Sequence, residues 1–566
     1  MCGIFGYLGK AHNETELFDA YNNIRPRGPE RSEYMQVDDF VHTYNGFHRL
    51  ALHDPTVKGD QPFFYEDSKR RIYTGCNGEI YNFKELVKKH ELEMQSGSDA
   101  EVVIRMYLKY GIEKISQEIR GEYALYIYDY DVDGRNFMLY LMRDQCGVRP
   151  LYYGYGENQF AFCSELKGLT YNLGKDGVKQ IVPHVQQFPP RHYLRLDCWP
   201  DNGKCSIKQN WFQHIDFSNV ETKIKDLEEA KEKIREGLTK SVLGKIHCDR
   251  EIGALLSGGL DSSLVAAIAA KQYKKEGLKL KTFSIGLPKS TDRAFAEAVA
   301  SHIGSEHTHV EFSEEDFLET INRIVEVAET YDVLTIRAAT GNYLIGKWIR
   351  ENTNIKALLI GDGADELCSG HMYFHNAPDP ITSHNENIRL LENVHYYDCL
   401  RADRALANCG LEARVPFLDL EFINLYLSID PELRVPLKNE EGVKIEKYLL
   451  REAFRGTEIL PSEVLFRKKE DFSDSVSSNE RSWLSVIQER ANKIISDEEF
   501  AEACETYGHL PPTSKEALYF RRQFEHYYGQ GSVQLVLPEY WLPRWSGDID
   551  DPSARLLDVF DETNRD

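Results

Sequence analysis

A cysteine lies directly behind the initiator methionine, in the run Met1-Cys2-Gly3-Ile4-Phe5-Gly6. If Met1 is removed, Cys2 carries both a thiol and a free α-amine. Such an amine has an ordinary pKa of about 8, so a useful fraction is unprotonated near neutral pH and can take the thiol proton. This position therefore indicates a nucleophile that brings its own base. The alternative is a small buried cysteine near a strand start, because free cysteine is among the most buried residue types.

A second chemical signal is the loop Ser257-Gly258-Gly259-Leu260-Asp261-Ser262-Ser263, which follows an apolar strand and precedes an alanine-rich helix. Backbone N–H groups at a helix N-terminus favour an anion, and glycines allow the backbone to approach a phosphate closely. The loop is not a Walker A motif, because no Gly-Lys-Ser/Thr follows. The alternative is an ordinary glycine-rich turn. This interpretation is weaker, because the loop occurs together with the expected strand before it and the expected helix after it.

The elements that must position Cys2 are short strands separated by Gly, Asn and Asp, from residue 1 to about 210. Examples are Arg71–Cys76, Tyr123–Tyr130, Phe137–Arg143 and Gln159–Cys163. The pattern predicts a layered, mainly antiparallel β domain with a few helices. We place a domain boundary near residue 213, before a charged amphipathic helix expected over 223–245.

Beyond that boundary a strand, loop and helix pattern repeats. Strands are expected at Ile252–Leu256, Leu278–Ile285 and Ala357–Ile360, with helices at Leu264–Gln272 and Ala294–His302. Such alternation predicts a parallel sheet with ligands at the carboxyl ends of its strands. The acidic end of the chain, at 548–551 and 561–566, is expected to be a solvated tail.

The bulk composition excludes several classes of function. A net charge of −23 over 566 residues argues against a general nucleic-acid or anionic-membrane binder. The 11 cysteines are scattered, with no close pair in metal-ligand spacing, which fits reduced cysteines and a cytoplasmic location. No run approaches the ~18 apolar residues of a membrane span, and no signal-peptide pattern is found at the N-terminus.

Together the two motifs resemble those of a known family. Cys2-Gly3-Ile4-Phe5-Gly6 resembles the start of class II glutamine amidotransferases, and the 257–263 loop resembles the pyrophosphate loop of the ATP pyrophosphatase superfamily. In this order and at this length, the chain resembles the glutamine-hydrolysing asparagine synthetase family. Further matching segments are Arg27–Pro29, Asn77–Asn82, Thr330–Val333, Thr335–Ala338, Glu412–Asp419, Lys469–Asp474 and Pro512–Ala517.

The resemblance implies an α+β, Ntn-hydrolase-like glutaminase domain of antiparallel sheets and helices over residues 2–212. It implies an α/β synthetase domain with a parallel sheet and the pyrophosphate loop over 213–566. In the first domain, Cys2 would attack glutamine while the Asn77 side chain and the Gly78 N–H hold the oxyanion. The substrate pocket would be formed by Arg49, Leu50, Asn77, Gly78, Glu79 and Asp99.

In the second domain, the resemblance implies that Asp261 and Asp365 hold Mg²⁺ on the phosphates of the substrate ATP. Asp362 and Lys469 would take part in forming and stabilising the acyl intermediate. ATP would be bound by Leu256, Ser257, Gly258, Gly259, Asp261, Ser262, Ile285, Ile360 and Gly361. Arg337 and Arg414 are expected to support the aspartate or phosphate pocket.

Three of these residues have plain alternatives when they are considered alone. Arg49 beside an apolar strand is otherwise a snorkelling surface residue, and Asp99 is otherwise a helix N-cap. Lys469 is otherwise part of a solvated charge cluster, since surface ion pairs are common and weak.

The chain also departs from the usual family pattern. Family members usually carry Ser, Glu and Ser at Ile360, Asp362 and Ala364, and Phe-Gly at Cys368-Ser369. Asp362 is one methylene shorter than the usual glutamate at the position linked to adenylate formation. In addition, Asn376 replaces a basic residue, and Glu30 replaces an aspartate. We expect the surrounding loop to compensate at Asp362.

The sequence thus predicts an enzyme that activates aspartate as a β-aspartyl-adenylate and supplies it with ammonia released from glutamine. A rival is a relative that adenylates another carboxylate, such as a β-lactam-forming cyclase, which needs no glutaminase. A non-catalytic descendant is a third hypothesis, supported only by the loop around Asp362. The expected partners are glutamine, aspartate and ATP, without nucleic acid or membrane. The oligomeric state stays open, with a homodimer as one option, and so does the removal of Met1.

Overall fold

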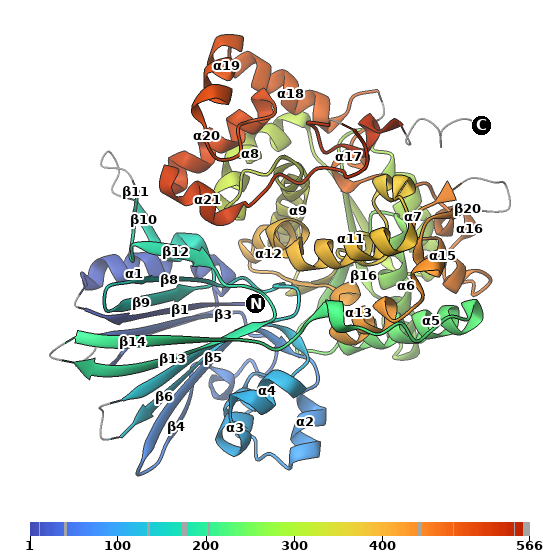
Figure 1. Cartoon of the computed structure of the whole chain (residues 1–566). Coiled ribbons are helices and arrows are strands. Elements are labelled where there is room, and N and C mark those ends of the chain that lie inside the picture. The colour runs from blue at the N-terminus through green and yellow to red at the C-terminus, as the bar shows by residue number, and fades with distance from the viewer. Residues whose placement is uncertain are drawn as a thin grey trace.

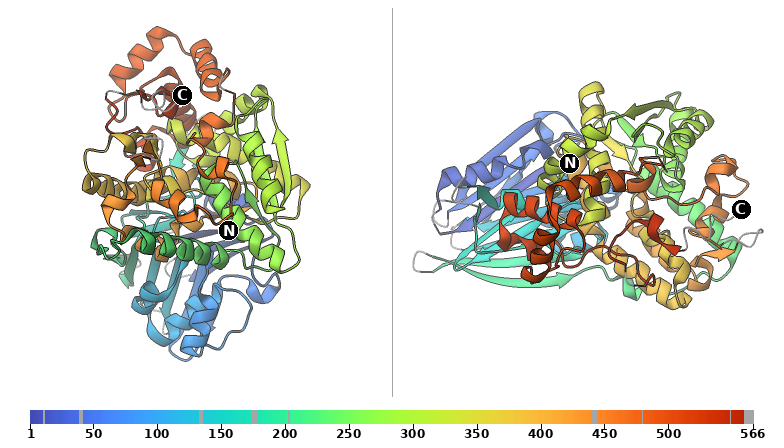
Figure 2. Two further views of the ribbon diagram at one scale, coloured as in Figure 1. Left: turned by 90° about the vertical axis from the view of Figure 1, so that its right-hand side faces the viewer. Right: turned by 90° about the horizontal axis from the view of Figure 1, so that it is seen from above.

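The computed structural model describes residues 1–10, 12–38, 42–132, 136–172, 178–201, 204–438, 444–478, 480–547 and 549–558. The N-terminal part is built on antiparallel sheets and the C-terminal part on a parallel sheet flanked by helices (Figure 1). The predicted fold class of each part is therefore confirmed. Figure 2 shows the two parts lying against each other, with the blue and cyan strands gathered on one side. No described helix is both long and apolar enough to cross a membrane.

Two six-stranded sheets form the N-terminal part. The first has the order β12 (His184–Gln187), β8 (Tyr152–Gly156), β9 (Gln159–Cys163), β1 (Cys2–Gly9), β3 (Thr43–Arg49) and β2 (Arg31–Asp38). The second has the order β14 (Lys204–Gln213), β13 (His192–Asp201), β7 (Phe137–Arg143), β6 (Gly121–Asp131), β5 (Arg70–Ile80) and β4 (Phe63–Glu66). Strands β7 and β9 coincide with the ranges predicted from the sequence.

These sheets pack face to face, with helices on their outer faces (Figure 1). Strand β6 shows why, because successive side chains of a strand point to opposite faces. Tyr126 and Tyr128 pack in the core between the two sheets. Leu125 and Ile127 pack on the other side, in the core that includes α3 (Glu101–Tyr110) and α4 (Ile112–Glu118). Because β6 is apolar on both faces, it lies between two hydrophobic cores of the layered domain.

The C-terminal part contains a five-stranded, fully parallel sheet. Its order is β17 (Glu306–Glu311), β16 (Lys281–Gly286), β15 (Ile252–Leu255), β18 (Ala357–Leu359) and β19 (Glu412–Arg414). Helices α6 (Leu260–Lys275), α7 (Asp292–Ile303) and α9 (Val333–Asn352) pack against it. The expected sheet is confirmed, and the loops at its carboxyl end carry the predicted phosphate motif.

Two sequence expectations differ from the structure in detail. Helix α5 (Leu227–Gly244) begins four residues later than expected, because Asp226 accepts a hydrogen bond from the Glu229 N–H and caps it. The acidic end is not wholly solvated, since Asp551 pairs with the buried Arg337 at 2.8 Å. Residues 548 and 561–566 of that expectation lie outside the described residues.

Candidate active sites

The first site lies where β1 begins, next to β3 and β5. The Cys2 N–H donates to Asn77 Oδ1 at 2.9 Å, and the Cys2 thiol lies 3.9 Å from the Leu50 carbonyl oxygen. Burial raises the pKa of the Cys2 thiol, while the N-terminal ammonium, Leu50 and Arg49 oppose this rise. The structure thus brings the predicted nucleophile and the predicted oxyanion residue into direct contact, although they are 75 positions apart.

The neighbouring Asn77 and Gly78 have the features of an anion-binding pair. Asn77 Nδ2 is a buried donor that has no hydrogen-bond partner among the described residues. Gly78 has a φ of +136°, and an added Cβ would lie 1.9 Å from the Glu122 carbonyl oxygen. Only glycine fits this backbone, which has a conformation that L-residues rarely adopt. A buried and unsatisfied donor beside a thiol is what an oxyanion would use.

Beside this pair lies a cluster of two carboxylates and a histidine, formed by Glu79, Asp99 and His53. Glu79 Oε2 lies 3.1 Å from His53 Nε2 and 3.4 Å from the Arg414 guanidinium. Burial and Glu79 raise the pKa of Asp99 to about 7, against the effect of His53. Burial lowers the pKa of His53, but Glu79 and Asp99 outweigh it and raise the value to about 9. The two carboxylates of this cluster are therefore suited to attract a cation such as an α-ammonium group.

Arg49 is buried but already bound by protein groups. Its guanidinium donates to Asp60 and to the carbonyl oxygens of His53, Asp54 and Thr56. Asp60 also pairs with Arg31 near the surface. A substrate carboxylate at Arg49 would therefore have to share or replace Asp60. The role of Arg49 stays a prediction.

Met1 is part of this site in the structure. It is fully buried, and its ammonium lies 2.6 Å from Glu412 Oε2, on the parallel sheet. While Met1 is attached, the nitrogen of Cys2 is an amide that donates to Asn77 and cannot act as a base. A base on Cys2 itself thus requires removal of Met1.

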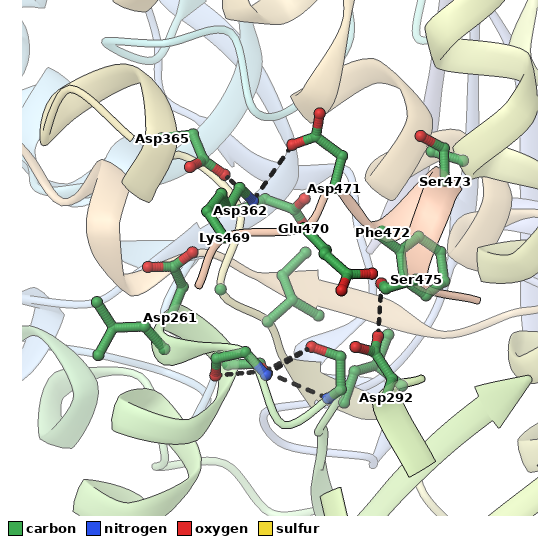
Figure 3. A pocket seen from close by; sticks show the side chains of 18 of the residues that line it. Asp261, Asp292, Asp362, Asp365, Lys469, Glu470, Asp471, Phe472, Ser473 and Ser475 are labelled. Carbon is green, nitrogen blue, oxygen red and sulfur yellow. Dashed lines mark hydrogen bonds and ion pairs between the residues drawn. The ribbon is translucent and has the colours of Figure 1, made fainter. Parts of the chain in front are cut away.

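The second site is a pocket at the carboxyl ends of β15, β16 and β18, drawn in Figure 3. Its walls include every ATP-site residue predicted from the sequence except Gly258. Gly258 does not line the pocket but is needed for the shape of the loop. Its φ is +81°, and an added Cβ would lie 2.5 Å from the Ala296 nitrogen. Gly259 is the N-cap of α6, so the loop presents the N-terminus of that helix to the pocket.

Two carboxylates and two lysines form the charged end of this pocket. Figure 3 labels three of them, Asp261, Asp365 and Lys469. Lys447 Nζ lies 2.5 Å from Asp261 Oδ2 and 2.7 Å from Asp365 Oδ1. Lys469 Nζ lies 2.9 Å from Asp365 Oδ2 and 3.4 Å from Asp471. Burial raises the pKa of Asp261, whereas the two lysines outweigh burial at Asp365 and hold its pKa well below its ordinary value. This arrangement can bind triphosphate oxygens and a divalent cation together.

Asp362 projects from the loop that follows β18. Its carboxylate lies 2.5 Å from the Arg401 guanidinium, which also pairs with Asp398. Burial raises the pKa of Asp362, and Arg401 opposes this rise. The loop starts at Ile360, whose N–H donates to the Arg414 carbonyl oxygen at 3.0 Å. The short carboxylate is thus held in place by residues that the sequence analysis did not connect to it.

The two arginines expected at the aspartate or phosphate pocket lie elsewhere. The Arg337 guanidinium pairs with Glu516 at 2.6 Å and with Asp551 at 2.8 Å, and Arg337 does not line the pocket. Arg414 reaches the other site and contacts Glu79. Neither guanidinium lines the pocket, and the supporting role of the two arginines stays a prediction.

Two other departures from the family pattern have structural partners. Asn376 donates to the Trp545 carbonyl oxygen at 3.2 Å. Glu30 accepts from the Ala51 N–H at 2.8 Å and from Arg250 at 2.5 Å, so it joins the two parts of the chain.

Sequence reasoning missed several residues that touch the sites, among them His53, Arg401 and Lys447. Each contacts a predicted residue: Glu79, Asp362 and Asp261 respectively. None of the three lies inside a motif that pointed to chemistry. Lys447 had no signal beyond its basic side chain within a helical, charged segment.

Comparison with known proteins agrees with this geometry. A glutamine amidotransferase domain matches residues 1–201, and an asparagine synthase domain matches 233–391 and 382–533. The asparagine synthetases [glutamine-hydrolyzing] of Gallus gallus and Homo sapiens are each 39% identical, over 98% of this chain and 98% of their own. That of Rattus norvegicus is 38% identical over 100% of both chains.

Among solved structures, the glutamine phosphoribosylpyrophosphate amidotransferase of B. subtilis is similar over 54% of this chain and 65% of its own, with 14% identity and a TM-score of 0.30. Both sites lie wholly within the regions that match the full-length relatives and the two domains. The chain belongs to the glutamine-hydrolysing asparagine synthetase family.

Proposed function

We propose that this chain converts L-aspartate, L-glutamine, ATP and water to L-asparagine, L-glutamate, AMP and diphosphate. The observation that carries the proposal is that one chain holds two candidate sites of different chemistry. A thiol lies beside an unsatisfied donor at one site, and a phosphate-type loop lies beside paired carboxylates at the other. Membership of the family supports the same reaction.

In the glutaminase site, the Cys2 thiolate would attack the side-chain amide of glutamine. Asn77 Nδ2 and the Gly78 N–H would stabilise the oxyanion, and ammonia would leave as the thioester forms. Water would then release glutamate. Glu79 and Asp99 would hold the substrate ammonium, and Arg49 its carboxylate.

In the synthetase site, the 257–262 loop and Lys469 would hold the phosphates of ATP. Asp261 and Asp365 would hold Mg²⁺, which suits carboxylate and phosphate oxygens and would neutralise phosphate charge. The buried Asp261 Oδ1 has no hydrogen-bond partner among the described residues, which fits such a ligand. The β-carboxylate of aspartate would attack the α-phosphorus and expel diphosphate, near Asp362.

Ammonia would pass inside the protein from Cys2 to the adenylate. We further propose a glutaminase domain over residues 2–212 and a synthetase domain over 213–566. We also propose a cytoplasmic homodimer that has no nucleic-acid or membrane partner. Strand β14, the last strand of the N-terminal sheets, ends at Gln213, and helix α5 begins at Leu227. The proposed boundary therefore falls at the end of this strand. Asparagine formation, measured with glutamine or with ammonium as nitrogen source, tests the proposed reaction.

The first prediction concerns the nucleophile. Cys2→Ala should lower glutamine-dependent asparagine synthesis at least about a thousandfold, because no thiol remains to attack the amide. Ammonium-dependent synthesis should survive, since the adenylating pocket is formed by other residues. Equal loss of both activities in parallel assays would contradict this assignment.

The second prediction concerns pH. With a pKa of about 7, Asp99 becomes neutral as the pH falls below 7 and no longer attracts the substrate ammonium. The kcat/KM for glutamine hydrolysis should therefore fall by up to about tenfold per pH unit below 7. Glutaric acid monoamide lacks the α-amine and serves as the control substrate. If its profile shows the same fall, Asp99 is not the cause.

The third prediction concerns the phosphate site. Asp261→Asn should abolish exchange of labelled diphosphate into ATP, because one of the two metal-binding carboxylates is lost. Glutamine hydrolysis measured alone should persist. Exchange at the wild-type rate would show that Asp261 has no such role.

The fourth prediction concerns Asp362. Asp362→Asn should slow adenylate formation by about a hundredfold, because this carboxylate is positioned by Arg401. Asp362→Glu should gain nothing, since the added methylene would crowd a site built around aspartate. Diphosphate exchange measures both variants. A large rate increase in Asp362→Glu would refute compensation by the loop.

A further inference from the structure

His53, Glu79 and Asp99 form a cluster of which the proposed reaction uses only the two carboxylates. Glu79 belongs to β5, whereas His53 lies in the loop after β3 and Asp99 in the turn before α3. One nitrogen or oxygen atom from each of the three side chains lies within 4.8 Å of the other two. Among the described residues, no other three histidine, cysteine, aspartate or glutamate side chains meet so closely.

The cluster is shielded from water, and one of its oxygens lacks a hydrogen bond. Glu79 and Asp99 are each 4% exposed, and the His53 side chain is 11% exposed. Glu79 Oε2 lies 3.1 Å from His53 Nε2 but has no hydrogen bond to a described residue. Asp99 is held in place by the Ile80 N–H, which donates to Oδ2 at 2.6 Å. A buried oxygen without a hydrogen bond is costly, and a bound cation would remove that cost.

One imidazole nitrogen and two carboxylates are a ligand set that suits Zn²⁺. Zinc binds histidine nitrogen and carboxylate oxygen at about 2.1 Å, so two ligand atoms of a tetrahedral site lie about 3.4 Å apart. The 3.1 Å between His53 Nε2 and Glu79 Oε2 is close to this value. The ligand atom of Asp99 is within 4.8 Å and needs a shift of at most ~1.4 Å. Mg²⁺ prefers six oxygen ligands and fits this set less well.

Charges around the cluster set the conditions under which a metal ion binds. The pKa of His53 is about 9 and that of Asp99 about 7, so near neutral pH protons occupy ligand atoms of the cluster. A metal ion would displace these protons, as it does at other histidine and carboxylate sites. The Arg414 guanidinium lies 3.4 Å from Glu79 Oε2 and repels a cation. We therefore expect weaker binding than at a structural zinc site.

We propose that His53, Glu79 and Asp99 bind Zn²⁺ and that the bound ion inhibits the glutaminase. The binding itself needs only the cluster, whereas the inhibition rests on the proposed role of Glu79 and Asp99 in holding the glutamine ammonium. The ion would occupy both carboxylates and exclude the ammonium, without contacting the synthetase pocket. Inhibition is therefore competitive with glutamine and spares ammonium-dependent synthesis.

Equilibrium binding of Zn²⁺ tests the site directly. The protein carries Cys2→Ala, because an N-terminal cysteine can bind zinc by itself, and excess Mg²⁺ competes at the synthetase pocket. Calorimetry at about pH 8, with free Zn²⁺ set by nitrilotriacetate, should give a Kd that His53→Asn and Asp99→Asn each raise at least about tenfold. No binding by the Cys2→Ala protein, or an unchanged Kd in either variant, would overturn the proposal.

His90 provides a matched control. It is a buried histidine that lies 2.5 Å from Glu118, but among the described residues this pair has no third ligand within the same reach. Added to Cys2→Ala, His90→Asn should leave the Kd of Zn²⁺ unchanged. If His90→Asn raises the Kd as much as His53→Asn does, the effect is not specific to the cluster and the proposal fails.

Inhibition is measured on the protein that retains Cys2. Free Zn²⁺ should raise the KM for glutamine hydrolysis and leave kcat unchanged, while ammonium-dependent synthesis at the same free Zn²⁺ keeps its rate. His53→Asn should raise the inhibition constant at least about tenfold, because one ligand is lost and the thiol remains. Equal inhibition of His53→Asn and of the unaltered protein would place the ion on the thiol and overturn the proposal.

The two measurements together separate the zinc site from the proposed function. Zn²⁺ that binds at the cluster without raising the KM would overturn the inhibition and the role of Glu79 and Asp99 in holding the ammonium. Glutamine hydrolysis at Cys2 would still stand in that case, since Cys2→Ala tests it independently. Competitive inhibition that is lost in His53→Asn supports both the zinc site and the ammonium site.

Discussion

A layer of buried ion pairs between the two parts of the chain holds both sites in place. Arg149 pairs with Glu122 at 2.8 Å and lies 3.7 Å from Glu412, while Arg27 pairs with Asp403 at 2.7 Å. Such pairs add little net stability, because dehydrating the charges is costly, but removing one partner costs about 3–5 kcal/mol. A shift of one part against the other would leave these charges unpaired, so the layer fixes their relative position.

The same layer gives the two sites a common support. The Nε of Arg27 donates to the Cys2 carbonyl oxygen at 3.0 Å, so the residue that pairs with Asp403 also positions the proposed nucleophile. Strand β19 supplies Glu412 to the layer and pairs with β18, which leads into the loop of Asp362. The Cys2 thiol and the loop of Asp362 are therefore both positioned from the interface. Under the proposed function, ammonia released at the first site would meet a second site at a fixed place.

Parts of this arrangement could be predicted from the sequence because their chemistry lies within a few adjacent residues. The 257–262 loop is such a case, since strand, glycines, hydroxyls and helix follow one another. Lys447 could not be found in this way, because its partner Asp261 is 186 positions away and no local pattern marks it. Arg401 was missed for the same reason, because its partner Asp362 is 39 positions away. A buried arginine is assigned by the carboxylates that surround it, and these are brought together only by the fold.

Asp362 shows how such distant contacts change the interpretation of a motif. In the sequence it appears as a glutamate shortened by one methylene, which suggests a loss of reach. In the structure its carboxylate is held by Arg401, which is itself held by Asp398, so its position depends on these two side chains as well as on its own length. The backbone before it is tied to β19 through Ile360, and Gly361 packs so closely that an added Cβ would lie 2.6 Å from the Ser262 nitrogen. The loop is therefore pressed against the phosphate loop, and the placement of the carboxylate is a property of the two loops together.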